Sequence, residues 1–437
     1  MASSSAELEV SIEALRANIT SLQALHESIL TALDDQTATV SNLNTDLDSM
    51  WLIIGGILVF FMQGGFAMLE IGNSPVRATK NMLLKNVLDS CVACIGWYTI
   101  GFGIAFGAND GNTGSKVSGT ENFFLKGEKF GATYGDYGTA EGYNWAYWFF
   151  QYAFCGAATT IISGAVGVRI TLMAYFSVSL IMSSFIYAIY ARWMWSVSGW
   201  LSPWRSDELL FGCGAIDFAG SGVVHMVGGV AALTLCWIIG PRLGRFVDGE
   251  AMELPKQSAV LQVMGLFILW TGWYGFNSVS TLYLVGFAHV SAKVCVTTTI
   301  SASTSAVAAA ALAMLTTGRV SHEEVINGIL GGLVAITSGC AVVEPEGAFV
   351  IGVVAAPIFM WGVKLLIWLK IDDSVDAIPV HLFCGIWGVI APGLLTTKEA
   401  YSQAYFSDRA ENCCGALYGC GHAQLAAQVV AVAMCFC

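Results

Sequence analysis

The sequence predicts an all-α polytopic membrane protein: eleven transmembrane helices with 5+5 inverted repeats, behind an N-terminal extracellular coiled-coil helix. Of its 437 residues, 56% are hydrophobic and 11% are charged, a balance typical of chains that cross a bilayer many times. A motif with an acid eight residues before a histidine occurs in two separate apolar segments. The first 50 residues are polar and follow a heptad period instead.

The N-terminal segment, residues 1–50, is expected to form a separate domain built from one helix. It contains no Pro or Gly, and His26 and Gln36 take the two polar positions of its heptads. A helix lying on the membrane surface is the alternative, but its acidic side chains argue against that, because interfacial helices favour Lys and Arg. The apolar heptad positions are Leu8, Ile12, Leu15, Ile19, Leu22, Ile29, Leu33, Val40, Leu43 and Leu47.

The membrane domain is expected to occupy residues 51–437. Each apolar run of about 20 residues is long enough to cross a bilayer as a helix. After His422 only about 22 Å of helix remains against a hydrocarbon core near 30 Å, so the last helix is expected to be cut short. The candidate spans are 51–72, 86–107, 144–167, 171–191, 214–240, 257–281, 285–317, 325–343, 347–369, 376–396 and 422–437.

Basic residues in two loops predict the orientation. Arg77, Lys80 and Lys85 lie in the first of these loops, and Arg242 and Arg245 lie in the second. The positive-inside rule places both loops in the cytoplasm, the N-terminus outside the cell and the C-terminus in the cytoplasm. Spans five and ten then run in opposite directions, as an inverted repeat of five helices requires.

The repeated motif joins Asp217 to His225 in span five and Asp373 to His381 in span ten. On one helix, eight residues separate an acid from its histidine by about 12 Å along the axis. Ionisable groups inside a membrane are costly and often mark a transport pathway, although one histidine alone is as often a packing residue. Asp217 is also expected to cap a helix, and Asp373 to be a solvated or capping residue.

The thirteen cysteines are mostly scattered through apolar segments, where they behave as small hydrophobic residues. Cys413, Cys414 and Cys420 instead cluster in a polar loop, where a disulfide is an open alternative. The net charge of −12 lies largely in the N-terminal segment. Nucleic acid is not an expected partner of this chain.

Several longer motifs resemble the ammonium transporter family, Amt/Mep/Rh, and most closely its plant and algal branch. They are DFAGSGVVHMVGG (217–229), GWYGFN (272–277), GILGGLVAITSGCAVVEP (328–345), VHLFCGIWG (380–388) and FMQGGFAMLEIGNSPVRATKNMLLKNVLD (61–89). The resemblance covers the chain from about residue 51 onward. It implies a homotrimer in which every subunit has its own hydrophobic pore.

The resemblance also implies an outer site for ammonium. Trp195 corresponds to the family's recruitment tryptophan, and Ser280 to the hydroxyl beside it. Asp217 would supply negative potential from behind, and Phe154 and Phe276 would form a stacked phenyl gate below. An indole face attracts a cation by about 1–2 kcal/mol when water is excluded. Taken alone, Trp195 would more often be an interfacial anchor, and either Phe a core residue.

Below the gate, the resemblance implies that His225 and His381 hydrogen-bond to each other and line an apolar conduit, with Trp273 in its wall. Imidazole suits this position because one ring nitrogen donates while the other accepts. A bare cation is costly in such a conduit, so neutral ammonia passes more easily once the proton is removed.

Some residues depart from the family pattern. Pro379, Leu382 and Phe383 surround the second histidine where small residues are usual, so a narrower conduit is expected. Val168 and Arg169 stand where many members carry an acid followed by arginine, which places the local ion pair in doubt.

The predicted function is uptake of ammonium and methylammonium across the plasma membrane, with the lipid bilayer and ammonium or ammonia as partners. An enzyme is not expected, nor any cofactor or metal. Two alternatives remain open: an ammonium sensor that does not transport, and a neutral ammonia channel of the Rh kind.

Overall fold

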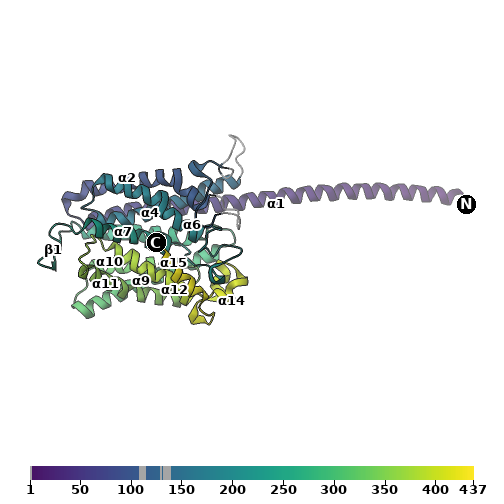
Figure 1. The fold of residues 1–437 in the computed structure, drawn as a ribbon. Helices are drawn as coiled ribbons and strands as arrows, with labels where there is room; N and C mark the ends of the chain where they lie inside the picture. The colour runs from purple at the N-terminus through teal and green to yellow at the C-terminus, as the bar shows by residue number, and fades with distance from the viewer. Residues whose placement is uncertain (1, 108–114, 128–129, 131–138) are drawn as a thin grey trace.

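A computed structural model describes residues 2–107, 115–127, 130 and 139–437. Figure 1 shows a bundle of roughly parallel and antiparallel helices from which one long helix projects. We call the end of the bundle with the projecting helix the extension end. The opposite end carries a short hairpin, β1 (Phe246–Val247) and β2 (Glu250–Ala251), and we call it the hairpin end.

Nine helices among the described residues are long and apolar enough to cross a membrane. Several of these nine helices are composite, because an α-helix is continued by a turn of another helix type. The nine helices follow in chain order. They are α1 (Ala2–Gly72); α2 (Thr79–Gly96) with η2 (Trp97–Gly101) and α3 (Phe102–Phe106); α4 (Thr139–Val166); α5 (Leu172–Ile181) with η6 (Met182–Ile186) and α6 (Tyr187–Trp195); η8 (Ser221–Met226) with α7 (Val227–Ile239); α8 (Ala259–Ser278) with η9 (Val279–Thr281); α9 (Ala288–Thr317); α11 (Pro345–Trp368); and η10 (Ile378–Phe383) with α12 (Cys384–Leu395).

Two helices at the remaining expected spans are shorter. They are α10 (His322–Thr337) and α15 (Ala423–Met434), and α15 is the apolar one of the two. Short helices α13 (Lys398–Ala404) and α14 (Ala410–Cys413) lie in the connection between α12 and α15 at the extension end. The prediction of a largely helical membrane protein is confirmed.

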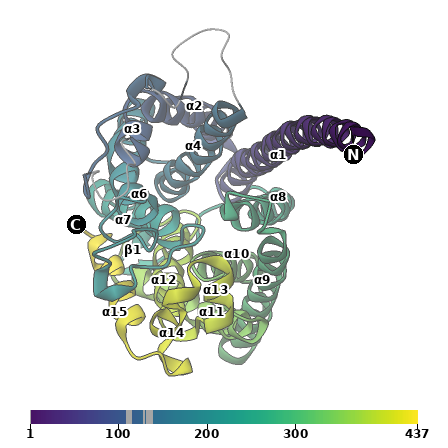
Figure 2. The same cartoon turned by 90° about the vertical axis from the view of Figure 1, so that its right-hand side faces the viewer.

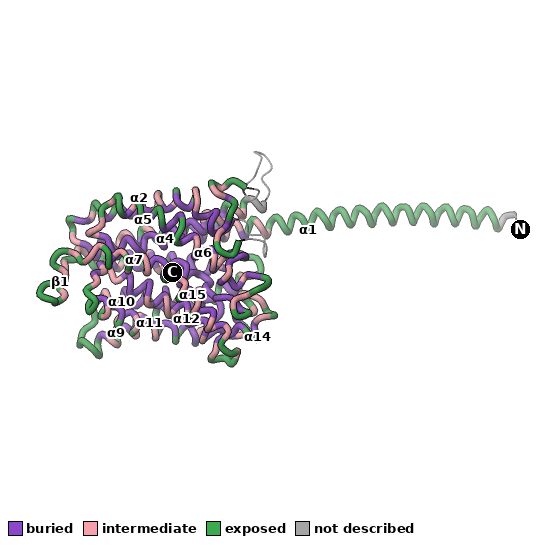
Figure 3. The backbone as a smooth tube through the Cα atoms, in the orientation of Figure 1, coloured by how far each residue is buried: buried purple, intermediate pink, exposed green. Residues whose placement is uncertain are grey.

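Helix α1 continues through the expected domain boundary at Trp51 without a break. What changes near that boundary is exposure: the segment before it is almost entirely exposed, and the segment after it packs into the bundle (Figure 3). Asp48 is the first deeply buried acid of the helix, and its Oδ1 accepts hydrogen bonds from the backbone N–H groups of Leu284 and Val285. The base of the projecting helix is therefore fixed to the loop after α8.

Helix α1 packs between α4 and α8, as Figure 2 shows from the extension end. Its contact with α8 is very close at Gly65 and Gly265. A Cβ added to Gly65 would lie 3.0 Å from the Gly265 carbonyl oxygen, and one added to Gly265 would lie 2.7 Å from the Gly65 carbonyl oxygen. Small residues allow such backbone contact between helices in lipid, where no hydrophobic effect drives association.

Two disulfides tie the loops of the extension end. One joins Cys414 to Cys420, within the cysteine cluster seen in the sequence. The other joins Cys413 to Cys213, which lies 200 residues away. The interpretation of Cys213 as a simple packing residue was therefore wrong, because only the fold brings its loop beside α14.

Candidate functional site

Both motif histidines lie in π-helical turns, His225 in η8 and His381 in η10. Their exposed fractions are 0% and 5%, and their Nδ1 atoms lie 3.1 Å apart. One ring must donate its proton while the other accepts, so the two histidines hold complementary tautomers. The Nε2 atom of His225 has no protein partner among the described residues and remains available for hydrogen bonding. Single π turns inside α-helices are frequent at functional sites.

Reciprocal close contacts bring the histidines together. Gly229, four residues after His225, packs against Leu382, the residue after His381. An added Cβ there would lie 2.7 Å from the Leu382 backbone nitrogen. Gly385 takes the matching position after His381, and its added Cβ would lie 2.9 Å from Met226 Cγ. A larger residue at either position would push the two helices, and therefore the two rings, apart.

The acids of the motif lie outside the helical turns that carry the histidines. Asp217 precedes the helix start at Ser221, and Gly220 between them has a left-handed φ of 106°. The expectation of an acid and a histidine two turns apart on one helix was therefore wrong for this copy. Asp217 Oδ1 accepts from the N–H of Gly220, and Oδ2 accepts from those of Gly222 and Val223. Asp217 is a helix cap, as expected.

Asp373 caps the second helix in the same way. Its Oδ1 accepts from Val375 N–H and its Oδ2 from Ile378 N–H. The capping alternative is thus the one that holds for Asp373. Neither acid reaches the histidine pair directly, and both hold the first turn of a histidine helix in place.

A column of aromatic rings lies on the extension side of the histidines. Phe154 of α4 and Phe276 of α8 stack with ring centroids 4.0 Å apart. Phe276 lies 5.5 Å from His225, and Phe154 lies 5.8 Å from Trp195 of α6. Two phenyl rings therefore separate the tryptophan from the histidines.

Trp273 flanks the same column. Its indole is nearly parallel to the His225 ring at 5.1 Å, and its Nε1 donates to Thr337 Oγ1 over 3.0 Å. The hydrogen bond fixes the indole against the imidazole. Thr337 of α10 gave no signal in the sequence, because a threonine in an apolar helix is usually bonded to its own helix.

A cavity of about 480 Å³ opens above the phenyl pair at the extension end, and Trp195 and Ser280 both line it. A smaller cavity of about 40 Å³ shares these two residues and reaches Phe154. Trp195 Nε1 donates to the Asp217 carbonyl oxygen over 2.7 Å, which holds the indole in the wall. Ser280 Oγ donates to the Phe276 carbonyl oxygen over 2.7 Å, so its lone pairs can accept from a bound N–H group.

Sequence reasoning missed most of the cavity wall. Aromatic rings make up the greater part of it, and isolated aromatic residues in a membrane chain give no signal that distinguishes a wall from a core. The additional lining residues include Phe106, Tyr143, Tyr147, Trp204, Phe218 and Tyr283.

The large residues after His381 pack against neighbouring helices. Leu382 fills the space beside Gly229, and Phe383 packs against Gly362 and Trp361 of α11. Phe383 therefore occupies a helix interface on the α11 side. The larger residues after the second histidine therefore fill space between helices.

Arg169 has no acid beside it at position 168, as expected, and pairs instead with an acid about 200 residues along the chain. Arg169, Arg242 and Arg245 surround Asp372 at the hairpin end, with Arg242 Nε 2.7 Å from Oδ2. Burial acting alone would raise the pKa of the Asp372 carboxyl, but the hydrogen bonds and charge of Arg242 outweigh burial and lower it. Asp372 is thus an ionised anchor between three loops.

The profile described as Ammonium Transporter Family matches residues 50–437. Ammonium transporter 1 member 3 of Solanum lycopersicum is 37% identical over 402 residues, which cover 89% of this chain and 84% of the relative. Ammonium transporter Amt2 of Archaeoglobus fulgidus is 39% identical over 385 residues, covering 86% of this chain and 77% of the relative.

Solved structures give the same result. The structure titled Sensor Amt Protein superposes with a TM-score of 0.78 at 28% identity and covers 91% of both chains. Candida albicans Mep2 superposes with a TM-score of 0.76 at 26% identity, covering 90% of this chain and 81% of Mep2. The buried histidine pair, the aromatic column above it and these similarities lead to one conclusion: the protein belongs to the ammonium transporter family.

Proposed function

We propose that the protein takes up ammonium and methylammonium across the plasma membrane, by binding the cation at Trp195 and Ser280 and passing ammonia between the histidines. The observation that carries this proposal is the unbroken column of Trp195, Phe154, Phe276 and His225, in which successive ring centroids are 4.0–5.8 Å apart. Its relatives named as ammonium transporters support the substrate.

The outer cavity suits a small cation that has lost part of its hydration shell. The Trp195 face offers cation–π attraction, and Ser280 offers an acceptor for one N–H group. Asp217 adds negative charge behind the indole without lining the cavity, because its carboxylate is directed at the first N–H groups of η8. Cation recruitment in this chain is therefore built from a π face, a hydroxyl and a remote charge.

Past the phenyl pair, the conduit favours the neutral species. Trp273, Phe276 and the two imidazoles surround a path in which a bare cation would lose its hydration without replacement. His225 Nε2 can exchange a hydrogen bond, or a proton, with the passing nitrogen. If the released proton follows along the histidines, transport carries charge, and if it returns outward, transport is neutral.

Current after an ammonium jump on solid-supported proteoliposomes tests this proposal. We expect a sustained current in the parent protein that falls sharply in His225→Ala. The control is His26→Ala, which alters an exposed histidine of the projecting helix far from the pore. Equal currents in the parent and His225→Ala would overturn the role of the histidine pair.

A sensor that binds ammonium without transporting it is a second candidate, because one of the similar structures is titled Sensor Amt Protein. Saturable binding that Trp195→Phe abolishes, with neither current nor methylammonium uptake in the parent, would favour it. Uptake without current would favour a neutral channel of the Rh kind. Trp193→Phe is the matched control for Trp195→Phe, because Trp193 donates its N–H to Val117 outside the cavity.

Three copies of the chain are proposed to associate, with the projecting half of α1 forming an extracellular three-helix coiled coil. The proposed trimer has eleven membrane helices per subunit in five-plus-five inverted repeats, and its C-termini face the cytoplasm. Support comes from the heptad leucines from Leu8 to Leu43, which are more than half exposed in the single chain, among them Leu22 at 63%. A coiled coil would bury this row of leucines between the helices.

Charge introduced into the heptad row tests the coiled coil. Leu22→Asp should convert much of the trimer to monomer on native detergent gels. Val10→Asp is the matched control, because Val10 is equally exposed, at 67%, but lies off the heptad row. Trimer of unchanged stability in Leu22→Asp, or after deletion of residues 2–44, would contradict the proposal.

A further inference from the structure

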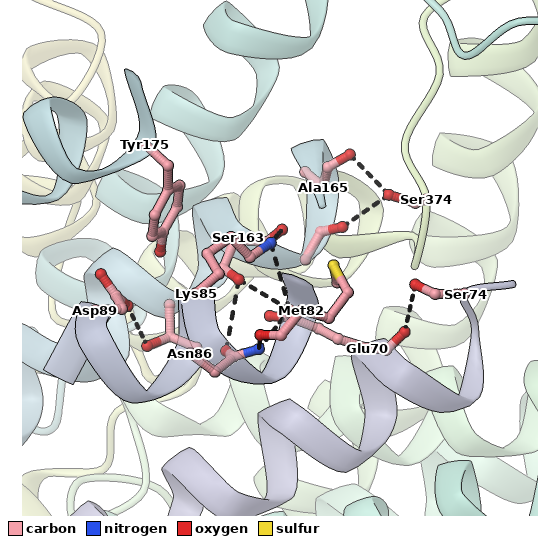
Figure 4. A network of polar contacts seen from close by, with 12 residues as sticks. Glu70, Ser74, Met82, Lys85, Asn86, Asp89, Ser163, Ala165, Tyr175 and Ser374 are labelled. Carbon is pink, nitrogen blue, oxygen red and sulfur yellow. Dashed lines mark hydrogen bonds and ion pairs between the residues drawn. The ribbon is translucent and has the colours of Figure 1, made fainter. Parts of the chain in front are cut away.

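A buried carboxylate on the hairpin side of the histidines has one oxygen that the protein leaves unsatisfied. Glu70 of α1 is buried between α1, α2 and α4 (Figure 4). Its Oε2 accepts from Asn86 Nδ2 over 2.9 Å and from Ser163 Oγ over 2.8 Å, and Lys85 Nζ lies 3.6 Å away. Its Oε1 is equally buried, yet it has no partner among the described residues. A buried acceptor without a hydrogen bond costs free energy, and a bound donor would remove that cost.

Glu70 also lines a small cavity, and His381 lines the same cavity. The cavity has a volume of about 20 Å³, and Thr160 and Asn327 supply its other polar side chains. Gly164 of α4 lines the cavity as well, and a Cβ added there would lie 3.7 Å from Oε1 and 2.8 Å from Val375 Cγ2. A cavity of this size holds about one molecule as small as water or ammonium.

The charges around this cavity favour a cation. Glu70 and Asp89 are both buried acids, and Lys85 is the one base that the structure places in contact with Glu70. Asp89 accepts from the hydroxyl of Thr160 and also has an unsatisfied oxygen, Oδ1. Arg169 lies farther off and is paired with Asp372. The group of three therefore carries a net charge of −1 when ionised, which a buried environment penalises unless a positive charge joins it.

We propose that this cavity is a second ammonium site, placed after the histidines. Ammonia that has passed them takes up one proton there, relayed by His381 or supplied from the hairpin side, and the Glu70 carboxylate accepts an N–H bond from the cation that forms. Thr160 Oγ1 and the Asn327 side-chain oxygen provide further acceptors in the wall. Asn327 Nδ2 donates to Asp376 Oδ2 over 3.1 Å, which fixes the orientation of the amide. Ammonium fits the site better than a metal cation, because the acceptors are few and the ligand's own N–H groups can be aimed at them.

This inference rests on the proposed function, because His381 lines the cavity and the proposed path of the nitrogen passes between the histidines. The two sites have different consequences for kinetics. The outer cavity sets how much external ammonium is needed for half-maximal current, whereas the Glu70 site lies on the path by which the nitrogen leaves the histidines. Loss of the Glu70 site should lower maximal current and leave the half-saturating concentration nearly unchanged.

Ammonium-jump currents from proteoliposomes containing the full chain test the site. Glu70→Gln should lower maximal current about tenfold, the scale of one charge-assisted hydrogen bond, with half-saturation within about twofold of the parent. Trp195→Phe, measured beside it, should raise half-saturation instead. Unchanged maximal current in Glu70→Gln would overturn the second site.

A double variant separates ligand binding from simple neutralisation of Lys85. Glu70→Gln combined with Lys85→Gln keeps the net charge of −1 on Asp89 and leaves no unpaired lysine. Recovery of parental current in the double variant would mean that Glu70 only balances Lys85, and the second site would be wrong. Maximal current that stays about tenfold low would support ammonium binding by Glu70. The double variant also decides the matter if Glu70→Gln alone fails to fold.

The parent and His225→Ala, run in the same series, keep the two proposals distinct. A parent without ammonium current or methylammonium uptake would overturn the proposed transport and the second site together. A parent with current that His225→Ala removes, but that Glu70→Gln leaves intact, would overturn the second site alone.

Discussion

The two motif segments, Asp217 to His225 and Asp373 to His381, share a plan and differ in what surrounds it. In each, an acid caps a helix, a π turn carries the histidine, and a glycine four residues later touches the other segment. The first segment holds Trp195 through the Asp217 carbonyl. The second follows Asp372, which three arginines surround. The same arrangement therefore adjoins the outer cavity at one end and a structural anchor at the other.

Removing either imidazole should have the largest effect. His225→Ala and His381→Ala should each lower ammonium turnover at least about 100-fold, because each removes the same hydrogen bond and one of two groups able to exchange a proton. Solid-supported current and methylammonium uptake measure this. A much smaller loss in His381→Ala would break the equivalence of the two segments.

A substitution of Asp372 tests the contribution of its three arginine pairs, which only the second segment has. Asp372→Asn should destabilise the detergent-solubilised protein by roughly 3 kcal/mol, because three arginines lose their buried counter-charge. A carboxyl with a lowered pKa stabilises the fold above its unfolded pKa, and that contribution is lost as pH falls.

The difference in thermal midpoint between Asp372→Asn and the parent should therefore persist down to about pH 4 and shrink only as pH falls below it. Ile216→Val, at the equivalent position of the first segment, is the control and should cost about 1 kcal/mol. A pH-independent difference would show that packing, and not charge, holds this end.

Gly229 and Gly385 hold matching positions in the two segments but have different neighbours. Gly229→Ala should cost about 2 kcal/mol or more, because the new methyl group would meet the backbone nitrogen of Leu382. Gly385→Ala should cost less, because its nearest neighbour is the flexible side chain of Met226. Thermal unfolding in detergent ranks the two, and the reverse order would contradict the contact geometry.

The caps should show the smallest effects. Asp217→Asn and Asp373→Asn should each lower stability by about 1 kcal/mol, since the amide oxygen still accepts a hydrogen bond. Only Asp217→Asn should also raise the ammonium concentration for half-maximal current, because Asp217 alone lies behind Trp195. A similar rise in Asp373→Asn would point to a general loss of structure.

Much of this architecture follows from local patterns. Apolar runs mark helices wherever a backbone must satisfy its hydrogen bonds without water, and the heptads before Trp51 predict a helix that the structure continues into the first span. The motif predicted that His225 and His381 belong together, and their Nδ1 atoms lie 3.1 Å apart. The family was predicted from its motifs and is confirmed.

Contacts between distant segments escaped sequence reasoning. Asp217 was placed on one helix with His225, because spacing alone does not reveal the left-handed turn at Gly220. The partners Cys213 and Cys413 lie 200 residues apart, and Arg169 reaches Asp372 across a similar distance. Lys85 looked like part of a basic loop, whereas it is buried beside Glu70.

The sequence by itself determined which segments are helical and where the long apolar runs lie, because these properties depend on neighbours within a few turns. Only the tertiary structure decided which polar groups are satisfied. Glu70 has one oxygen bonded and one without a partner among the described residues, and it lines a cavity that His381 shares, an arrangement set by α1, α2, α4 and η10 together. Burial and hydrogen bonding are properties of packed helices, and no local pattern encodes them.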